Sequence, residues 1–121
     1  MRLFQHRLDT CGLVQLDGER YARVRDSKDP IAATVIENYR IWSKHSTNAD
    51  KHSSTLFDTV AVYLAFSHDL CQMEKVGLRV TDDGFTRIDA SAKQINAATA
   101  WKDLTAYEDL LVGRLTSPLK N

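Results

Sequence analysis

The sequence predicts a mixed α+β fold in which helices come first, a small β-meander follows and a helix closes the chain. Three observations support this order. Apolar residues recur at helical spacing through residues 30–43 and 54–70, alternate with polar residues through 75–81, and return to helical spacing after residue 103. The chain has 121 residues, the size of one domain, and we treat 1–121 as a single domain.

The first third of the chain is expected to hold an extended segment, residues 8–16, and two helices. Asp17-Gly18 is a turn signal, and residues 19–26 are expected to form a short helix. Asp29-Pro30 then opens a longer helix, because Asp accepts hydrogen bonds from the free amides and Pro is tolerated in the first turn. Apolar residues at helical spacing should turn this helix toward the core: Ile31, Val35, Tyr39 and Trp42.

Residues 54–70 are predicted to form a helix buried inside the protein, because this segment is apolar nearly all round. The polar residues 43–54 before it are expected to be a loop. Asp58 is the lone charge early in the helix. It is either a helix cap, which the free amides and the helix dipole favour, or a ligand for a hard cation such as calcium. Periodicity leaves both interpretations open.

The last third of the chain is predicted to form a meander and a closing helix. Residues 76–80 alternate in the manner of a strand with one buried face, and Asp82-Asp83-Gly84 is a hairpin turn signal. Residues 85–88 and 93–101 are expected to be the second and third strands. Asp103 should cap a helix that ends before Pro118 and turns these residues toward the core: Leu104, Tyr107, Leu110, Leu111 and Leu115.

The composition argues against several classes of protein. With 43% hydrophobic residues the chain is too apolar to be disordered, and it has no apolar run long enough for a bilayer or a signal peptide, so we expect a cytoplasmic protein that binds no membrane. Sixteen Lys and Arg balance sixteen Asp and Glu without a basic run, which argues against a nucleic-acid partner. Cys11 and Cys71 match no zinc or redox spacing and are expected to be buried thiols.

A self-contained catalytic motif is absent from the sequence. There is no serine-hydrolase elbow, no Gly-rich phosphate loop and no zinc-protease motif. The four histidines lie in polar surroundings without ligand spacing and are expected at the surface: His6, His45, His52 and His68.

Residues 54–64, Ser-Thr-Leu-Phe-Asp-Thr-Val-Ala-Val-Tyr-Leu, resemble the C-terminal motif of inosine/uridine-type nucleoside hydrolases, where a His-Asp-Pro-x-Ala-Val segment starts a buried helix. Leu8-Asp9-Thr10 resembles the Leu-Asp-Val-Thr strand end of that family, and residues 76–115 resemble its C-terminal hairpin and last helix. The resemblance covers nearly the whole chain and implies the C-terminal portion of an α/β fold, whose members are more than twice this length.

The resemblance implies calcium-assisted hydrolysis of the N-glycosidic bond of a ribonucleoside, which releases the base and ribose. Asp58 matches a calcium ligand of the family motif. Phe57 stands where many members have a His that protonates the leaving base; its ring would face the base, but it has no proton to donate. Tyr39 and Trp42 match a region that lines the base pocket, although their helical spacing also makes them core candidates.

The Asp-rich N-terminal motif of the family, which holds the general base and most calcium ligands, is absent from this sequence. We therefore assign no catalytic residue and expect no turnover from this chain alone. The alternative is a non-catalytic interaction or self-associating module derived from the same fold. Its uncovered apolar surface would be covered in a homo-oligomer, or by a complementing chain that supplies the missing residues.

Overall fold

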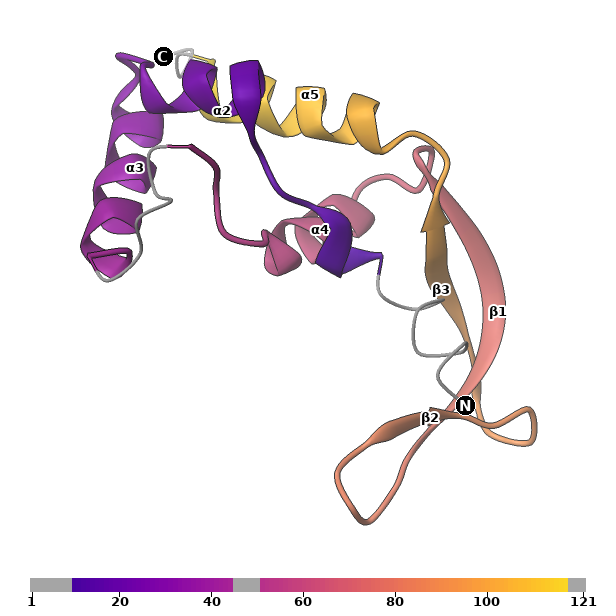
Figure 1. Cartoon of the computed structure of the whole chain (residues 1–121). Coiled ribbons are helices and arrows are strands. Elements are labelled where there is room, and N and C mark those ends of the chain that lie inside the picture. Colours follow the sequence, from indigo (N-terminus) through magenta and orange to yellow (C-terminus); the bar gives the residue numbers. More distant parts are fainter. Residues whose placement is uncertain (1–9, 45–50, 118–121) are drawn as a thin grey trace.

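The computed structural model describes residues 10–44 and 51–117, and it has a mixed α+β architecture within them (Figure 1). In chain order the elements are η2 (Cys11–Leu13, a 3-10 turn), α2 (Gly18–Arg25), α3 (Pro30–Trp42), α4 (Phe57–Leu64), β1 (Cys71–Val80), β2 (Thr86–Ile88), β3 (Gln94–Trp101) and α5 (Leu104–Thr116). The α+β order predicted from the sequence is confirmed. No helix in the described ranges is long and apolar enough to cross a membrane.

One hydrophobic core lies where α2, α3 and α5 meet (Figure 1). The predicted opening of α3 is confirmed, because the side chain of Asp29 accepts a hydrogen bond from the amide of Ile31 at 2.9 Å and Pro30 takes the first helical position. The side chain of Asp103 caps α5 in the same way, through the amide of Ala106 at 2.9 Å. The buried members of this core are Leu16, Tyr21, Val24, Ala32, Ile36 and Val112.

A second core joins α4 and α5 to the start of the sheet. Its buried members are Val14, Val60, Tyr63, Cys71 and Tyr107. Because Val112 lies in the first core and Tyr107 in the second, α5 connects the two. The segment after the undescribed residues 45–50 is also fixed, since the amides of Ser53 and Leu56 donate to the carbonyls of Leu16 and Val14.

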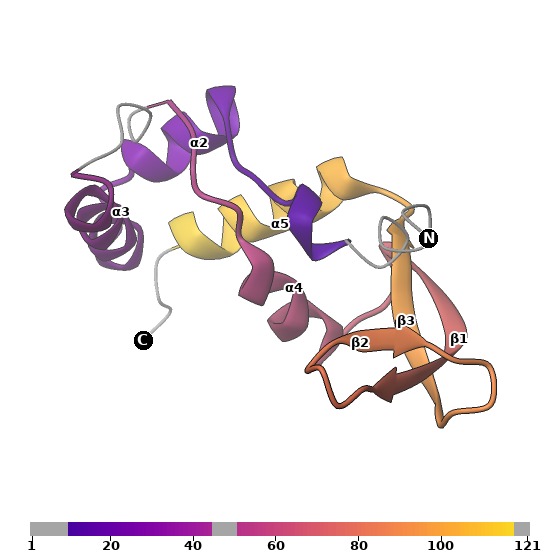
Figure 2. The same ribbon diagram turned by 60° about the horizontal axis from the view of Figure 1, so that its bottom comes forward.

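The sheet has the order β2-β1-β3 and is antiparallel throughout. The predicted β-meander is wrong, because a meander would have the second strand in the centre, whereas here the long β1 lies in the centre and pairs with both β2 and β3. The Asp82-Asp83-Gly84 turn is confirmed: Gly84 has a φ of +81°, and the amide of Thr81 donates to the carbonyl of Phe85. The hairpin end of the sheet extends away from the helices at the bottom of Figure 1, and Figure 2 shows the same end turned forward. Val80 is therefore 73% exposed, so the prediction of one buried face is wrong at that end of β1.

The segment predicted to be extended, residues 8–16, differs in part from the prediction and lies in part outside the described residues. Residues 11–13 form η2 and are not extended; residues 8 and 9, like Pro118, lie outside the described ranges. Thr10 lies beside β3, where its hydroxyl donates to the carbonyl of Ala98 and its own carbonyl accepts from the indole of Trp101, both at 2.8 Å.

The inward face of α3 differs from the prediction. Ala32 and Ile36 are buried, whereas Ile31, Val35 and Trp42 are exposed, Trp42 by 67%. The helix is present, but it is turned by one residue relative to the expected stripe. The small side chain of Ala32 lets the helix approach its neighbours closely, and a helix with two alternative apolar stripes takes the orientation that its neighbours allow.

The helix predicted over 54–70 is shorter and less buried than expected. It spans only Phe57–Leu64 and turns Val60 and Tyr63 inward, while Val62 and Phe66 are 66% and 62% exposed. The chain leaves the helix because the amides of Phe66 and Ser67 both donate to the carbonyl of Tyr63. Only one side of α4 has neighbours to pack against, so an all-round apolar sequence leaves apolar side chains in solvent.

Candidate functional site

The carboxylate of Asp58 lies in the first turn of α4 and is exposed. The N-cap residue of this helix is Leu56, and it makes no side-chain capping bond. The hydroxyl of Thr59 donates to the carbonyl of Leu56 at 2.7 Å, so Thr59 does not cap the free amides either. Within the described residues no hydrogen bond or ion pair holds the carboxylate of Asp58. Asp58 thus carries its charge at the positive end of a helix dipole, without a partner that would explain it as a structural cap.

Phe57 stands next to Asp58 and is 54% exposed. An exposed aromatic ring at a helix start is available to stack on a flat ligand. Phe57 and Asp58 are therefore the two members of the predicted site that the structure places together at the surface.

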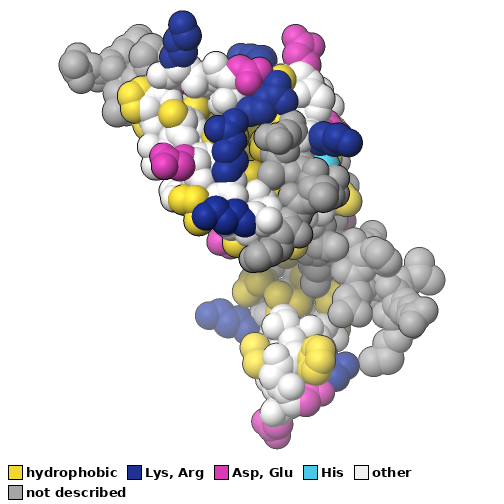
Figure 3. Space-filling view, turned by 60° about the vertical axis from the view of Figure 1, so that its left-hand side comes forward, with side chains coloured by type: hydrophobic (Ala, Val, Ile, Leu, Met, Phe, Trp, Pro, Cys, Tyr) yellow, Lys and Arg dark blue, Asp and Glu magenta, His cyan; other side chains and the backbone are white. Residues whose placement is uncertain are grey.

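Tyr39 and Trp42 belong to a different part of the molecule. Their rings contact each other at 5.5 Å, and the ring of Tyr39 meets that of Tyr21 on α2 at 6.5 Å. Burial raises the pKa of the Tyr39 hydroxyl, while the indole of Trp42 stands mostly in solvent. On the face that carries α3, apolar side chains lie scattered among Lys and Arg (Figure 3). The structure pairs these two residues with α2 and shows no contact of theirs with Phe57 or Asp58 in the described ranges.

The described residues do not make a complete calcium site. Calcium takes about six to eight oxygen ligands, and residues 10–44 and 51–117 contain no group of three or more His, Cys, Asp or Glu side chains that could hold a metal ion. Asp58 supplies one carboxylate and no more. The described residues therefore do not fit a calcium ion by themselves, and no chemical step through calcium follows from them.

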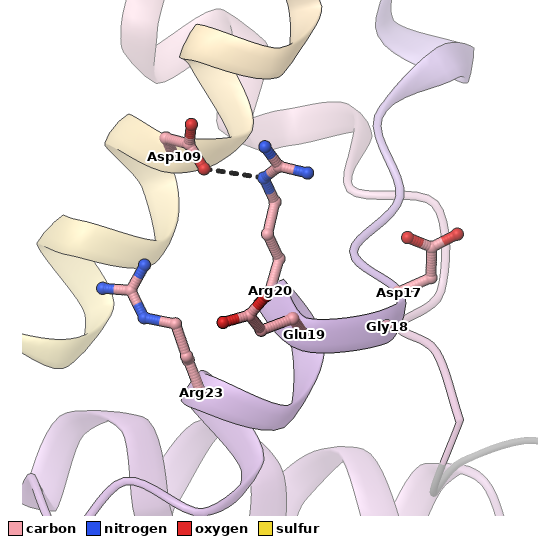
Figure 4. A pocket seen from close by; sticks show the side chains of 6 residues that line it. All are labelled: Asp17, Gly18, Glu19, Arg20, Arg23 and Asp109. Carbon is pink, nitrogen blue, oxygen red and sulfur yellow. Dashed lines mark hydrogen bonds and ion pairs between the residues drawn. The ribbon is translucent and has the colours of Figure 1, made fainter.

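A polar cleft of about 250 Å³ lies at the start of α2, between that helix and α5 (Figure 4). The Nε of Arg20 donates to Oδ1 of Asp109 at 2.7 Å, which raises the pKa of the guanidinium and lowers that of the Asp109 carboxyl. Burial raises the pKa of the neighbouring Glu108, whose carboxylate is 4.0 Å from Arg20. The cleft is lined by Asp17, Gly18, Glu19, Arg20, Arg23 and Asp109. Three carboxylates thus lie among two guanidinium groups, and the ion pair of Arg20 with Asp109 joins α2 to α5.

An apolar groove of about 180 Å³ runs between α4 and α5. At its floor the hydroxyl of Tyr107 donates to Oγ1 of Thr59 at 2.8 Å, and the rings of Tyr107 and Tyr63 meet edge to face at 5.2 Å. Burial raises the pKa of the Tyr107 hydroxyl, which keeps it neutral. The full lining is Thr59, Val62, Tyr63, Phe66, Tyr107, Leu110, Leu111 and Arg114, so Arg114 is its one charged side chain. Apart from the all-round apolar character of residues 54–70, no sequence pattern predicts this groove.

The thiols and imidazoles in the described part of the chain do not form a metal site. Cys71 is buried and Cys11 half-buried, and the two form no disulfide. Burial raises the pKa of the Cys71 thiol and so disfavours the nucleophilic thiolate. The prediction of buried thiols is thus confirmed for Cys71 and met in part by Cys11. His68 is exposed as expected, while half-buried His52 lies 2.8 Å from the carbonyl of Ser53. His6 and His45 lie outside the described residues.

Comparison with known proteins gives no further guide to the site: no family model, no curated protein and no solved structure matches this chain. The assignment of function therefore depends on the residues and their geometry.

Proposed function

We propose that this chain is related to the C-terminal portion of inosine/uridine-type nucleoside hydrolases, and that α4 contributes Asp58 and Phe57 to a nucleoside site that other residues complete. The observation that carries this proposal is the position of Asp58. Its carboxylate is exposed in the first turn of a helix, without a structural partner in the described part of the chain, at the place where the family motif has a calcium ligand. The sequence Leu56 to Val62 supports the same assignment.

Each of the two residues has a role that follows from its chemistry. The carboxylate of Asp58 offers oxygen to a hard cation, and it lies at the end of α4 where the helix dipole favours negative charge. The ring of Phe57 offers a flat apolar face to a nucleobase. It cannot protonate a leaving base, so bases that leave without protonation suit this site better than bases that need it.

The chain alone is not expected to turn over nucleosides. Activation of water needs a general base or a fully coordinated metal ion, and the described residues group no set of ligands around Asp58. The test is ribose release from inosine and from uridine, with millimolar calcium and with the calcium chelated. We expect no release above the background of buffer in either case. Robust, calcium-dependent release by the isolated chain would contradict the proposal, because it would require a complete site within these 121 residues.

A second candidate function is a non-catalytic interaction module, and a separate observation favours it. Val62 and Phe66 are 66% and 62% exposed on one face of α4, beside an apolar groove. Adjacent exposed apolar side chains of this kind mark contact surfaces more often than scattered single ones do. This candidate needs no ligand at Asp58 and is compatible with an absence of turnover.

A further inference from the structure

The two cysteines stand 60 positions apart in the sequence, and the fold brings both to the second core. Cys71, the first residue of β1, is a buried member of that core, and Cys11 packs against the core from η2. Cys71 is 0% exposed, whereas Cys11 is half-buried. The core therefore holds one shielded thiol and one that solvent reaches, although their spacing in the sequence matches no redox motif.

A hydrogen bond to β3 fixes the start of η2 next to Cys71. The carbonyl of Thr10, the residue before Cys11, accepts from the indole of Trp101 at 2.8 Å. In the antiparallel pairing of β1 with β3, Trp101 lies directly opposite Cys71, and opposite residues have Cα atoms about 4.5 to 5.5 Å apart. Trp101 thus holds Thr10 through its ring and pairs with Cys71 through its backbone, which places Cys11 beside the start of β1.

An electrostatic interaction between the two thiols agrees with this placement. The pKa of the Cys71 thiol is raised first by burial and next by the negative charge that Cys11 carries when it ionises. Burial is also the main cause that raises the pKa of the Tyr107 hydroxyl, and the charges of both thiols add to it. Since like charges affect one another strongly over about 4 to 6 Å, the two thiols and this hydroxyl form one cluster.

The turn that carries Cys11 can adjust to a bond between the two sulfurs. η2 has three residues, none of them buried, and the hydrogen bond that closes it, from the amide of Val14 to the carbonyl of Cys11, is long at 3.4 Å. A disulfide needs Cβ atoms about 3.5 to 4.5 Å apart. A short turn at the edge of a core accommodates a shift toward this distance more easily than a packed helix or strand does.

We propose that Cys11 and Cys71 form a reversible disulfide when the chain meets a small-molecule disulfide such as oxidised glutathione. The thiolate of Cys11 attacks one sulfur of oxidised glutathione, and a glutathione thiolate leaves. The thiolate of Cys71 then attacks Sγ of Cys11, and a second glutathione thiolate leaves. Two protein thiols are oxidised, one small-molecule disulfide is reduced, and the two glutathione thiolates take up the two thiol protons.

The order of the two steps follows from exposure. Cys11 reacts first because solvent reaches it, while Cys71 is enclosed and reacts only with a sulfur that is already beside it. The bond would join η2 to the start of β1 and close a long loop, so it should stabilise the fold by restricting the unfolded chain. This inference is independent of the proposed nucleoside site and of the interaction-module candidate.

Treatment of the full chain with oxidised glutathione, at about 1 µM chain so that reaction within one chain outruns reaction between chains, tests the inference. We expect intact mass spectrometry to show the loss of two hydrogen atoms, with neither thiol open to alkylation, and peptide mapping to find the two cysteines linked. The melting temperature of the oxidised chain should rise by at least about 5 °C, and excess dithiothreitol should reverse both changes.

Two variants separate the steps. C71A keeps the accessible thiol without its partner and should accumulate one glutathionyl group on Cys11. C11S keeps only the enclosed thiol, so Cys71 should stay reduced and the melting temperature should not respond to oxidised glutathione. C11S is also the matched control for folding, because Cys11 is only half-buried, and circular dichroism establishes that each variant is folded.

The contrary outcomes are distinct from the expected ones. A wild-type chain that stays reduced, that keeps a glutathionyl group without an internal bond, or that is oxidised only to covalent dimers overturns the inference. A melting temperature of C11S that rises with oxidant as much as that of the wild type also overturns it. Ribose release does not enter any of these measurements, so the failure of this inference and the failure of the nucleoside proposal are told apart.

Discussion

The hydrogen bond between Tyr107 and Thr59 offers the sharpest test of how the second core is built. The ring of Tyr107 is 2% exposed, and its hydroxyl donates to Oγ1 of Thr59 at 2.8 Å, across 48 residues of sequence. The hydroxyl of Thr59 donates onward to the carbonyl of Leu56 at 2.7 Å. Removing one partner or the other should therefore have unequal effects on the free energy of unfolding.

The Y107F substitution removes the donor. Thr59, which is only half-buried, keeps its own hydrogen bond to the carbonyl of Leu56. We expect a loss of about 1 kcal/mol, the net contribution of one hydrogen bond. The T59V substitution leaves the buried hydroxyl of Tyr107 without an acceptor and the carbonyl of Leu56 without a donor. Its cost should be about 2 kcal/mol, because an unsatisfied buried group loses its full solvation.

Urea unfolding of the wild type, both single variants and the double variant measures these values in one cycle. The double variant should be less destabilised than the sum of the two single ones by about 1 kcal/mol, since the Tyr107 hydroxyl is no longer present to be stranded. All four proteins must be compared at one protein concentration, because self-association adds to apparent stability. Strict additivity, or a larger cost for Y107F than for T59V, would refute this account of the core.

Three further predictions concern stability. G77A should lower the free energy of unfolding in urea by about 2 kcal/mol, because a Cβ there would lie 2.1 Å from the carbonyl oxygen of Asp89. G113A, inside α5, should instead raise it by about 0.5 to 1 kcal/mol, because a Cβ there meets nothing within 4 Å. Equal effects of the two substitutions would contradict the close packing at β1. D103A should remove the cap of α5 and cost about 1 kcal/mol, with a matching fall in melting temperature; an unchanged melting temperature would argue against the cap. Hydrogen bonds from Ser91 and from Arg79 lower the pKa of Asp89 to about 2. The contribution of Asp89 to stability is therefore complete above its unfolded pKa of about 4 and is lost as the pH falls toward 2. In urea unfolding between pH 5 and pH 2, D89N should lose less stability on acidification than the wild type, and an unaltered pH profile would count against this role of Asp89.

Local signals in the sequence were sufficient where one or two residues determine the backbone. Asp29-Pro30, Asp82-Asp83-Gly84 and Asp103 each predict a helix start or a turn, and each is confirmed. These signals act through hydrogen bonds and φ preferences within a few residues, so they do not depend on what the rest of the chain does.

Burial could not be predicted in the same way. α3 has two apolar stripes, one through Ile31 and Val35 and one through Ala32 and Ile36, and the second is buried although the first is larger. The choice depends on the shape of α2 and α5, which are placed by tertiary contacts. The sequence of α4 has apolar residues on all sides of the helix, and only one side is buried in the structure. The sequence did not show which side of α4 would be exposed to solvent.

The residues of the candidate site show the same difference between local sequence signals and tertiary contacts. Asp58 and Phe57 are candidates from the sequence because a short motif contains both, and a motif is local; their role in a site stays a prediction. The apolar groove between α4 and α5 was not predicted, because it joins Thr59 and Phe66 to residues of α5 that are more than forty positions away. The aromatic pair of Tyr39 and Trp42 was assigned to a base pocket through the resemblance, and the structure places the pair with α2.

The central claim is that Asp58 supplies a cation ligand to a site that other residues complete. The most direct measurement mixes this chain with a separately produced N-terminal segment of a nucleoside hydrolase that carries the Asp-rich motif, and follows calcium-dependent ribose release from inosine. We expect release with the wild-type chain and a rate lower by about 100-fold with D58N, which keeps the shape of the side chain but removes its charge. Equal rates for the wild type and D58N would contradict the claim.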